Sequence, residues 1–461
     1  MAKKEKLSLD EMLEQALVKD EDKSYEVPNN WIWTKLGNIA TIVGGGTPST
    51  LVDEYYTNGD IAWITPADLS GYNDIYISNG KRNITRFGLE KSSARLMPKD
   101  TVILSSRAPI GYVAIASNEL CTNQGFKSFL PSPIYRPKFL YFYLIQNKGM
   151  LESFASGTTF LELSGKKASQ IQIPIPPLSE QQRIVDLLES LFEKLDRAKE
   201  LAQNALDSFE NRKSAILHEA FTGELTSKWR EENGVKYNWD RKILKSVADF
   251  RPGYAFASSE FCDEGYQVIR MGNLYNGVLD LSRNSVFIKE EDINERIISR
   301  SKVLVGDILL ALTGTKYKRD YGFAVLIADE ANCLLNQRIV SLTAKGVETN
   351  YLWNYLKTDL FRNVFFSNET GGVNQGNVSS KFVETIQIPI PSISEQKEIV
   401  RILDNLHENE QSAKELCDVI ENIDHMKKSI LARAFRGELS TNNTYEESAL
   451  ELLKEVLNEK N

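Results

Sequence analysis

The segment Ile171-Gln-Ile-Pro-Ile-Pro176-Pro-Leu-Ser179-Glu180-Gln181 returns 215 residues later as Ile386-Gln-Ile-Pro-Ile-Pro391-Ser-Ile-Ser394-Glu395-Gln396. A second segment, Ala220-Phe221-Thr-Gly223-Glu224-Leu225, returns 214 residues later as Ala434-Phe435-Arg-Gly437-Glu438-Leu439. Self-similarity at one long period indicates an internal duplication. Weaker echoes precede both segments: Asn123-Gln124 with Asn336-Gln337, and Ala67-Asp68-Leu69 with Gly272-Asn273-Leu274. The sequence therefore predicts a tandem duplication with well-kept helices and strongly diverged globular parts.

Each repeat predicts a strand followed by a long helix. Alternating isoleucines from Ile171 predict the strand, which prolines end. Ser179 and Ser394 are predicted as helix N-caps, and Gly223 and Gly437 as helix stops. The apolar residues of both helices recur mainly at alternating spacings of four and three, which predicts a coiled-coil seam. The seam residues, which we expect to pack together or to bind partners, include Leu188, Leu191, Leu195 and Phe209 in the first helix and Leu406, Leu416, Ile420 and Ile423 in the second.

Two helices of matching length, each following a globular unit, favour an antiparallel coiled coil. The alternative explanation for a heptad pattern is ordinary packing of each helix on a globular core. The globular units are predicted to be α/β, because short apolar strand runs with Gly and Pro turns precede helical stretches. The predicted domains are a terminal amphipathic helix or tail (1–27), a first globular domain (28–178), a spacer helix with linker (179–235), a second globular domain (236–393), a second spacer helix (394–440) and a C-terminal amphipathic helix (441–461). Ser8 with Glu11 and Thr444 with Glu447 match capping boxes for the terminal helices.

Composition excludes several classes of protein. The 461 residues include no apolar run of membrane-spanning length and no signal peptide, and the four cysteines are scattered. These features predict a protein of the reducing cytoplasm. The formal charge is −8, but residues 28–178 carry 14 Lys and Arg against 10 Asp and Glu, and residues 239–393 carry 18 of each. The acidic excess therefore lies in the helices and tails, which leaves the globular units free to meet DNA.

No catalytic constellation is present in the sequence. The three histidines, His218, His407 and His425, lie in helical segments away from any nucleophile or metal-ligand cluster. Ser164-Gly-Lys-Lys167 lacks the glycine spacing and the final Ser or Thr of a phosphate-binding loop, and Gly44-Gly-Gly46 is a lone glycine turn. We therefore expect a chain that is not an enzyme by itself and that binds no metal and no cofactor.

Three basic segments are candidates for DNA contact. The first is the predicted hairpin tip that contains Thr313, Lys316, Tyr317, Lys318 and Arg319, where cations and aromatic rings alternate. Ser106 and Arg107 stand at the equivalent place in the first repeat, directly after a strand, and Lys81, Arg82 and Arg86 form a further basic cluster. A solvated surface loop is the alternative for each of them.

Taken together, these residues resemble the specificity subunits of type I restriction–modification systems. The resemblance rests on the twin Ile-Pro-Ile-Pro-x-x-Ser-Glu-Gln segments, the twin Ala-Phe-x-Gly-Glu-Leu segments, the run from Leu104 to Gly111 and the two Asn-Gln pairs, and it covers nearly the whole chain. It implies two target-recognition domains that each read one half of a split, asymmetric site in double-stranded DNA. It also implies that the paired helices set the gap between the halves and dock two modification subunits, which methylate adenine with S-adenosylmethionine. Two restriction subunits that use ATP and Mg²⁺ are a further implied partner.

Two other readings stay open at this point. A stand-alone sequence-specific or architectural DNA-binding protein could use the same duplication without a methyltransferase partner. A nuclease of unfamiliar type would need a metal-binding carboxylate cluster, which the sequence does not suggest.

Overall fold

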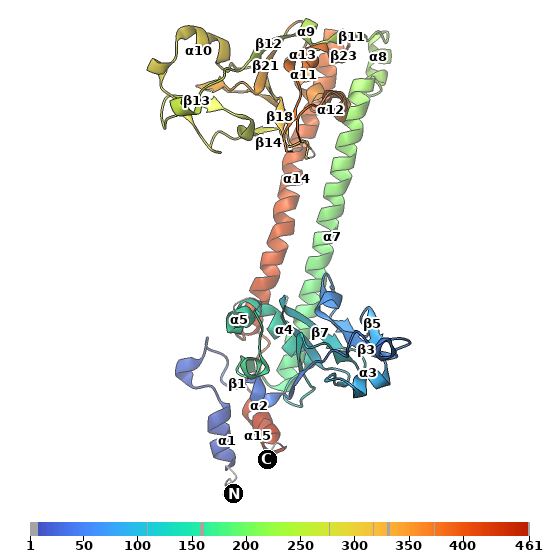
Figure 1. The fold of residues 1–461 in the computed structure, drawn as a ribbon, viewed down its shortest axis with the longest axis vertical. Coiled ribbons are helices and arrows are strands. Elements are labelled where there is room, and N and C mark those ends of the chain that lie inside the picture. The colour runs from blue at the N-terminus through green and yellow to red at the C-terminus, as the bar shows by residue number, and fades with distance from the viewer. Residues whose placement is uncertain are drawn as a thin grey trace. The chain divides into compact units, whose positions relative to one another are not determined.

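The computed structural model describes residues 8–107, 109–156, 161–275, 277–316, 318–329, 332–372 and 374–459, although not the side chains of residues 406–412 and 414. The chain divides into two compact units (Figure 1). The first unit combines Met1–Ala202 with Asp418–Asn461, and the second is Gln203–Cys417. The first unit is thus built from two segments of chain and the second from one.

The first unit is an α/β domain with two sheets and a short strand pair. One sheet has the order β2-β9-β6-β7-β4, another has the order β5-β3-β8, and β1 pairs with β10. The strands are β1 Ile32–Lys35, β2 Ile42–Gly44, β3 Ile61–Ile64, β4 Tyr76–Ile77, β5 Arg82–Ile84, β6 Val102–Ser106, β7 Ile110–Ala116, β8 Cys121–Thr122, β9 Phe126–Phe129 and β10 Gln172–Ile175. The helices are α1 Leu9–Ala16, η1 Asp20–Asp22, α2 Leu36–Ile39, η2 Asp53–Tyr55, η3 Pro66–Leu69, α3 Arg86–Glu90, α4 Pro137–Gln146, α5 Lys148–Phe154, α6 Gly165–Ala168 and α15 Ala449–Glu459.

The second unit has matching sheets with the orders β12-β21-β17-β19 and β16-β13-β20, and a matching pair β11-β23. Its strands are β11 Asp240–Ile243, β12 Ala248–Pro252, β13 Tyr266–Ile269, β14 Leu274–Tyr275, β15 Val278–Leu279, β16 Phe287–Ile288, β17 Asp307–Ala311, β18 Thr313–Gly314, β19 Ala324–Leu326, β20 Cys333–Leu335, β21 Ile339–Ala344, β22 Gly376–Asn377 and β23 Gln387–Ile390. Its helices are α8 Ser227–Asn233, α9 Leu244–Val247, η4 Ser258–Glu260, η5 Met271–Asn273, α10 Glu295–Ser301, η6 Glu290–Asp292, α11 Thr349–Leu356, α12 Asp359–Phe366 and α13 Ser380–Thr385.

Apart from β4, which has no counterpart among the described strands of the second unit, the two units share one topology, and this confirms the predicted tandem α/β fold. In each, one antiparallel strand and one parallel strand flank the central strand of the smaller sheet: β3 runs parallel to β8, and β13 runs parallel to β20. The central hairpins β6–β7 and β17–β19 are both antiparallel. The second unit adds the short pairs β14–β15 and β18–β22. The duplication thus extends through the globular parts, where the sequence retains only a few echoes.

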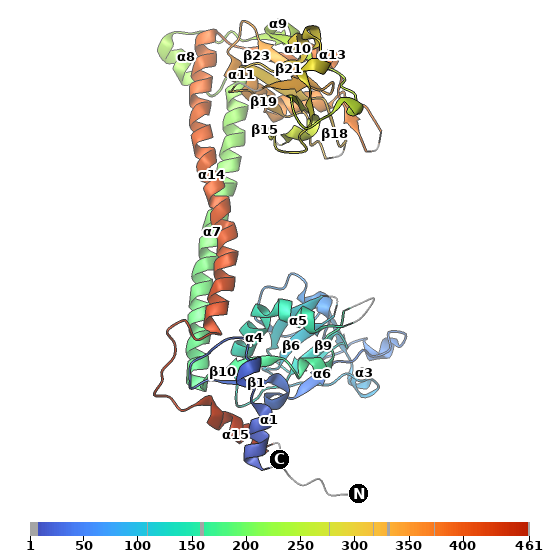
Figure 2. The same cartoon turned by 90° about the vertical axis from the view of Figure 1, so that its left-hand side faces the viewer.

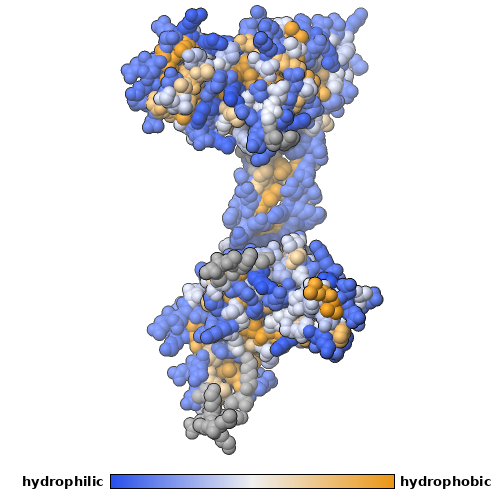
Figure 3. Space-filling model, in the orientation of Figure 1, coloured by the Kyte–Doolittle hydropathy of each residue, from blue (hydrophilic) through white to orange (hydrophobic). Residues whose placement is uncertain are grey.

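The long helices are α7 Leu178–Thr222 and α14 Ile393–Ala434. Within the first unit, Lys199 forms an ion pair with Asp424 and Lys427 forms one with Asp196, so residue numbers rise on one helix as they fall on the other. This pairing confirms the predicted antiparallel arrangement. An apolar strip between the helices, bordered by hydrophilic residues, is visible in Figure 3.

The predicted seam residues differ in burial. Leu188 and Ile423 are buried, whereas Leu191, Leu195, Phe209, Leu416 and Ile420 are half-buried. The side chain of Leu406 lies outside the described part of α14. A pair of helices leaves its seam partly open to water, which accounts for the half-buried majority.

The predicted helix caps need correction. Because α7 begins at Leu178 and α14 at Ile393, Ser179 and Ser394 lie inside the helices rather than before them. Ser392 caps α14, since its hydroxyl accepts from the Glu395 N–H at 3.3 Å. Both helices begin directly after the proline segment, two residues earlier than the predicted serine caps implied.

The Gln of each repeated Ser-Glu-Gln segment is buried and ties the long helix to its own unit. Gln181 accepts at 2.8 Å from the N–H of Arg136, which precedes α4, and Gln396 accepts at 2.8 Å from the N–H of Glu348, which precedes α11. Both amides also donate to a proline carbonyl of the segment before the helix. These bonds satisfy backbone donors that a helix start leaves without intrahelical partners.

The phenylalanine of each repeated Ala-Phe-x-Gly-Glu-Leu segment anchors the other end of a long helix. In the second unit, Phe221 contacts the rings of Tyr351 and Tyr355 with centroids 5.3 and 5.2 Å apart. In the first unit, Phe435 contacts Phe139 and Tyr143 at 5.2 and 5.1 Å. Each unit therefore packs on the start of one long helix and on the end of the other.

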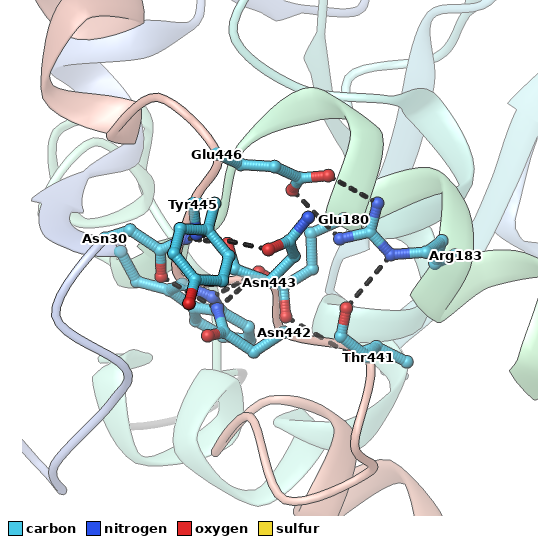
Figure 4. A network of polar contacts seen from close by, with 9 residues as sticks. Asn30, Glu180, Arg183, Thr441, Asn442, Asn443, Tyr445 and Glu446 are labelled. Carbon is cyan, nitrogen blue, oxygen red and sulfur yellow. Dashed lines mark hydrogen bonds and ion pairs between the residues drawn. The ribbon is translucent and has the colours of Figure 1, made fainter.

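A polar network ties the C-terminal segment into the first unit (Figure 4). The buried Glu180 carboxylate accepts from the Trp31 indole and the Asn442 amide, both at 2.8 Å, and from the Thr441 hydroxyl at 3.3 Å. Arg183 forms an ion pair with Glu446 at 2.7 Å. Because residues 30 and 31 belong to the N-terminal segment, the network joins both ends of the chain to the first turn of α7.

The terminal helices α1 and α15 lie together in the first unit, and both views show them side by side (Figures 1 and 2). The capping box of Ser8 and Glu11 is present, as predicted. The box predicted for Thr444 and Glu447 is wrong, because α15 begins at Ala449, after residues 441–446 have extended along the network.

Candidate nucleic-acid interface

A matching turn follows the parallel strand of the smaller sheet in each unit. We name it the Asn-Gln turn: residues 123–125 after β8, and residues 336–338 after β20. The N–H of Asn123 donates to the Ile64 carbonyl at 2.9 Å, and the N–H of Asn336 donates to the Ile269 carbonyl at 3.0 Å. The asparagine side chains accept backbone N–H groups inside their own turns, and Gln124 and Gln337 stand exposed. The sequence echo therefore marks one local structure built twice.

Glycines bring a second strand end against each turn. A Cβ atom on Gly45 would lie 1.9 Å from the Asn123 carbonyl oxygen, and one on Gly253 would lie 2.0 Å from the Asn336 carbonyl oxygen. No side chain fits in that space without moving the backbone. The next residues complete the contact, because Gly46 and Tyr254 donate their N–H groups to the last residues of β8 and β20.

Asp68 and Asn273, the second pair of positions at which the two repeats are weakly similar, each hold a later segment of chain close to the Asn-Gln turn of their unit. Asp68 accepts from the N–H of Lys81 at 2.9 Å, and the Asn273 amide donates to the Arg283 carbonyl at 2.7 Å. Lys81 is exposed, and so are Arg82 beside it and Arg283 in the second unit. Arg82 lies 3.5 Å from the centroid of the Tyr56 ring, and Arg283 lies 5.2 Å from that of Tyr275. Each unit thus presents a cation supported by an aromatic ring.

The central hairpins end beside the Asn-Gln turns. The N–H of Ser106 donates to the Gly125 carbonyl at 2.7 Å, and that of Leu312 donates to the Arg338 carbonyl at 2.9 Å. Ser106 is therefore the counterpart of Leu312, and its side chain is fully buried with the Lys127 ammonium 3.4 Å from its hydroxyl. A surface role predicted for Ser106 does not fit this burial. Arg107 follows it and is half-exposed, which leaves it available to a ligand.

The predicted tip in the second unit is a braced loop between β17 and β19. Thr313 is 3% exposed and lies in β18, so it supports the loop rather than presenting a side chain. The Lys316 ammonium donates to the Gly371 carbonyl at 3.2 Å, Lys318 is exposed, and Tyr317 lies outside the described residues. Arg319 adopts a left-handed φ of 48°, with its guanidinium 4.9 Å from the centroid of the Phe366 ring.

Two polar groups brace that loop, the half-buried Arg362 and the buried Tyr321. Arg362 donates to the carbonyls of Arg319, Tyr321 and Gly322 at 2.9 to 3.1 Å, and burial lowers the pKa of its guanidinium. The Tyr321 hydroxyl donates to Glu369 at 2.6 Å, and burial raises the pKa of this phenol above its ordinary value of 10.0. Tyr321 therefore stays a neutral donor at physiological pH, and the strained conformation of Arg319 is held in place.

Of the basic cluster in the first unit, Arg86 lies apart from the Asn-Gln turn. It sits in the first turn of α3 and forms an exposed ion pair with Glu90 at 3.3 Å. The structure does bring Lys81, Arg82 and Arg107 toward the turn through Asp68 and Ser106. Sequence reasoning missed Gln124, Gln337, Arg283 and Arg338 as candidate contacts, although the repeated Asn-Gln pair was a signal that could have found the two glutamines.

We name the resulting surface the polar edge: Lys81, Arg82, Arg107 and Gln124 in the first unit, and Arg283, Lys316, Lys318, Gln337 and Arg338 in the second. In the second unit β14 lies near β18 in Figure 1 and β15 lies near β18 in Figure 2, and the Thr313 hydroxyl contacts the Met271 sulfur at 3.5 Å. Cations and amide donors on a surface are suited to phosphate oxygens and to base edges.

Two other kinds of site were sought in the described residues. Within those ranges, no group of three or more His, Cys, Asp or Glu side chains is placed to hold a metal ion. No helix in the described part of the chain combines the length and the apolar character that a membrane span requires.

Comparisons with known proteins agree with one another. The family model described as the type I restriction modification DNA specificity domain matches residues 28–205 and 236–422. The specificity subunit of type I restriction enzyme MjaIX from Methanocaldococcus jannaschii is 37% identical over 275 residues, which cover 58% of this chain and 62% of that relative. The EcoKI specificity subunit of Escherichia coli K12 is 24% identical over 439 residues, which cover 90% of each chain.

Solved structures show the same fold. The crystal structure of the HsdS subunit from Thermoanaerobacter tengcongensis has a TM-score of 0.56 at 20% identity, over 90% of this chain and 99% of that one. A chain from a structure on complex assembly and conformational transition of the type I R-M system has a TM-score of 0.64 at 20% identity, over 90% and 100%. With its two copies of the DNA specificity domain, this chain belongs to the family of type I restriction–modification specificity subunits.

Proposed function

We propose that this chain reads a bipartite, asymmetric site in double-stranded DNA, with one target-recognition domain for each half. The observation that carries the proposal is that the two units share their topology and their Asn-Gln turns but differ in the loops around them. The β17–β19 hairpin carries a loop of residues 312–323, braced by Arg362, whereas β6 and β7 are joined by three residues, 107–109. Two unlike readers on one chain call for two unlike half-sites, because a palindrome would need identical readers.

The polar edge of each unit, together with Arg319 from the same loop as Lys318, is proposed to meet the DNA. Lys81, Arg82 and Arg107 serve the first half-site, and Lys316, Lys318 and Arg319 serve the second. Lysines near phosphates set the salt dependence of binding, and an arginine on a guanine contributes discrimination between bases. Tyr317 belongs to this set from its sequence position alone. We assign no DNA contact to Arg86, Thr313 and Ser106, which instead support the structure around them.

The partners and cofactors of the complex are also proposed from the family. Two modification subunits dock on α7 and α14, bind S-adenosylmethionine and methylate adenine, and two restriction subunits that use ATP and Mg²⁺ complete a restricting complex. This chain contributes no catalytic group and holds no cofactor of its own. The name shared by its relatives, specificity subunit, supports this division of labour.

Methylation sequencing of single DNA molecules tests the proposal. Cells expressing the chain with its modification subunit should show adenine methylation on both strands of one split motif, and cells without the chain should show none. A complex that assembles but leaves no split motif would contradict the proposal and would favour a stand-alone DNA-binding protein. Purified chain with Mg²⁺ should leave DNA intact, whereas cleavage would favour a nuclease.

A further inference from the structure

The Asn-Gln turn is the part of the polar edge that both units keep. The flanking segments have diverged: Arg107 in the first unit corresponds to the buried Thr313 in the second, and Gly125 corresponds to Arg338. Gln124 and Gln337, by contrast, occupy the same place, held by matching backbone bonds and by glycines at matching positions. Neither exposed side chain is needed to form the turn, whose shape depends on the asparagines and the glycines.

A group common to two readers of different sequences is suited to a feature common to both half-sites. The sugar–phosphate backbone is such a feature, because it is chemically the same at every base pair. Amide side chains are among the groups that bind phosphate oxygens and fix the register of a protein on its duplex. Base-reading groups, in contrast, must differ wherever the half-sites differ.

The chemistry of the amide favours a donor. The Thr47 hydroxyl donates to the Gln124 side-chain oxygen, so the amide N–H₂ group is left to face an acceptor. Phosphate oxygens only accept hydrogen bonds. Arg107 follows the strand end that is bonded to the first turn, and Arg338 lies within the second turn, so each turn has a basic residue near it along the backbone.

We propose that the Asn-Gln turn is a phosphate anchor in each unit. Gln124 and Gln337 each donate to one backbone phosphate of their own half-site, and the anchor sets the register in which the diverged loops meet the bases. The inference rests on the proposed function, since it supposes that each unit binds its own half-site.

The test uses the full chain with its modification subunits, and fluorescence anisotropy on a duplex that carries the methylated motif. Gln124→Ala and Gln337→Ala should each weaken binding by about 10- to 100-fold, the size of one lost hydrogen bond to a charged acceptor. The loss should be equal on the cognate duplex and on duplexes changed at single base pairs. Gln124→Glu should weaken binding more than Gln124→Ala, because a carboxylate repels phosphate.

Matched controls exist at the opposite ends of the same strands. Asn118 precedes β8 and Asn332 precedes β20, and both are exposed. Asn118→Ala and Asn332→Ala should bind DNA like the unchanged chain. Unchanged circular dichroism of all variants would show that they are folded.

Replacement of phosphates one at a time by neutral methylphosphonates locates the contact. A methylphosphonate at one position in the first half-site should abolish the difference in affinity between the unchanged chain and Gln124→Ala. A methylphosphonate at a different position, in the second half-site, should abolish the difference between the unchanged chain and Gln337→Ala. A loss confined to one base pair of the motif would overturn the anchor and make the glutamine a base reader. Unchanged binding would overturn the contact altogether. An unchanged chain that fails to discriminate the motif would contradict the proposed function itself, and the anchor with it.

Discussion

At the scale of residues, the two buried glutamates of the repeat are satisfied in different ways. Glu395 accepts from the Arg230 guanidinium and from the Thr226 hydroxyl, and both members of the ion pair are buried. Glu180 accepts from neutral groups, the Trp31 indole, the Asn442 amide and the Thr441 hydroxyl. The same residue of the repeat is thus matched by a cation in one unit and by dipoles in the other.

We expect Glu395→Gln to destabilise the second unit by about 3–5 kcal/mol, because it leaves Arg230 buried without its counter-charge. Glu180→Gln should cost about 1–3 kcal/mol, since it disturbs hydrogen bonds between neutral donors and one carboxylate. Urea denaturation gives the free energies of unfolding, and hydrogen–deuterium exchange assigns each loss to its unit. Equal losses in the two variants would contradict the role given to Arg230.

The ion pair between Arg183 and Glu446 makes the docking of residues 441–457 depend on pH. The Arg183 guanidinium lowers the pKa of Glu446 below its ordinary value of 4.5. A carboxyl group whose pKa is lowered by folding stabilises the folded state at pH values above its unfolded pKa, and this contribution disappears as the pH falls through the lowered pKa. Docking should therefore be complete at neutral pH and weaken below pH 4.5.

Hydrogen–deuterium exchange of peptides from residues 441–457 measures this docking at each pH. Glu446→Gln should exchange faster than the unchanged chain at neutral pH, and the difference should vanish in acid. A difference that persists at acidic pH would mean that the carboxylate charge contributes nothing.

At the scale of elements, the repeated phenylalanine decides how each long helix ends. Phe435 and Phe221 are buried among aromatic rings of α4 and α11. We expect Phe435→Ala or Phe221→Ala to lower the free energy of unfolding of its own unit by about 3–5 kcal/mol, and the corresponding leucine variants to lower it less. Exchange should accelerate in α4 for the first variant and in α11 for the second. The reverse pattern would contradict the assignment of each helix end to its unit.

The elements also show how far the sequence could predict this fold. Heptad spacing and the twin proline segments were enough to predict α7 and α14, because these patterns are local. The order of globular units and helices along the chain then predicted that the two helices pair antiparallel. The helix caps were displaced, since Ser179 and Ser394 carry the cap signal but the chain turns into helix before them. The helical stretches expected late in each globular unit include α11 and α12 in the second, which are separated at Thr358, whose hydroxyl caps α12 at 3.2 Å.

The polar edge was predictable in part. Lys81, Arg82, Arg107, Lys316 and Lys318 were predicted as basic candidates for DNA contact; the structure leaves all five exposed or half-exposed, and their contact with DNA stays a prediction. Ser106 and Thr313 were included because they follow strands, but their burial depends on strand pairing over long distances, which no local pattern reveals. The glutamines of the Asn-Gln turns were overlooked because a single neutral residue has no compositional signal.

At the scale of the molecule, the proposed reading of one half-site by each unit predicts that specificity is modular. Replacing residues 236–393 by the corresponding domain of a relative should change one half of the methylated motif and leave the other half unchanged. Replacing residues 28–178 should change the opposite half. Methylation sequencing gives both results, and a variant that alters both halves at once would contradict independent reading.

The first unit is assembled from both ends of the chain, and this has a consequence for synthesis. A ribosome adds residues 203–417 before it adds Thr441 and Asn442, so the sequence of the second unit is complete while the Glu180 carboxylate still lacks its partners. The first domain to emerge is thus the last that can finish folding. A premature stop codon a few residues after Ala434 would leave the sequence of the second unit complete and would leave Glu180 in the first unit without Thr441 and Asn442.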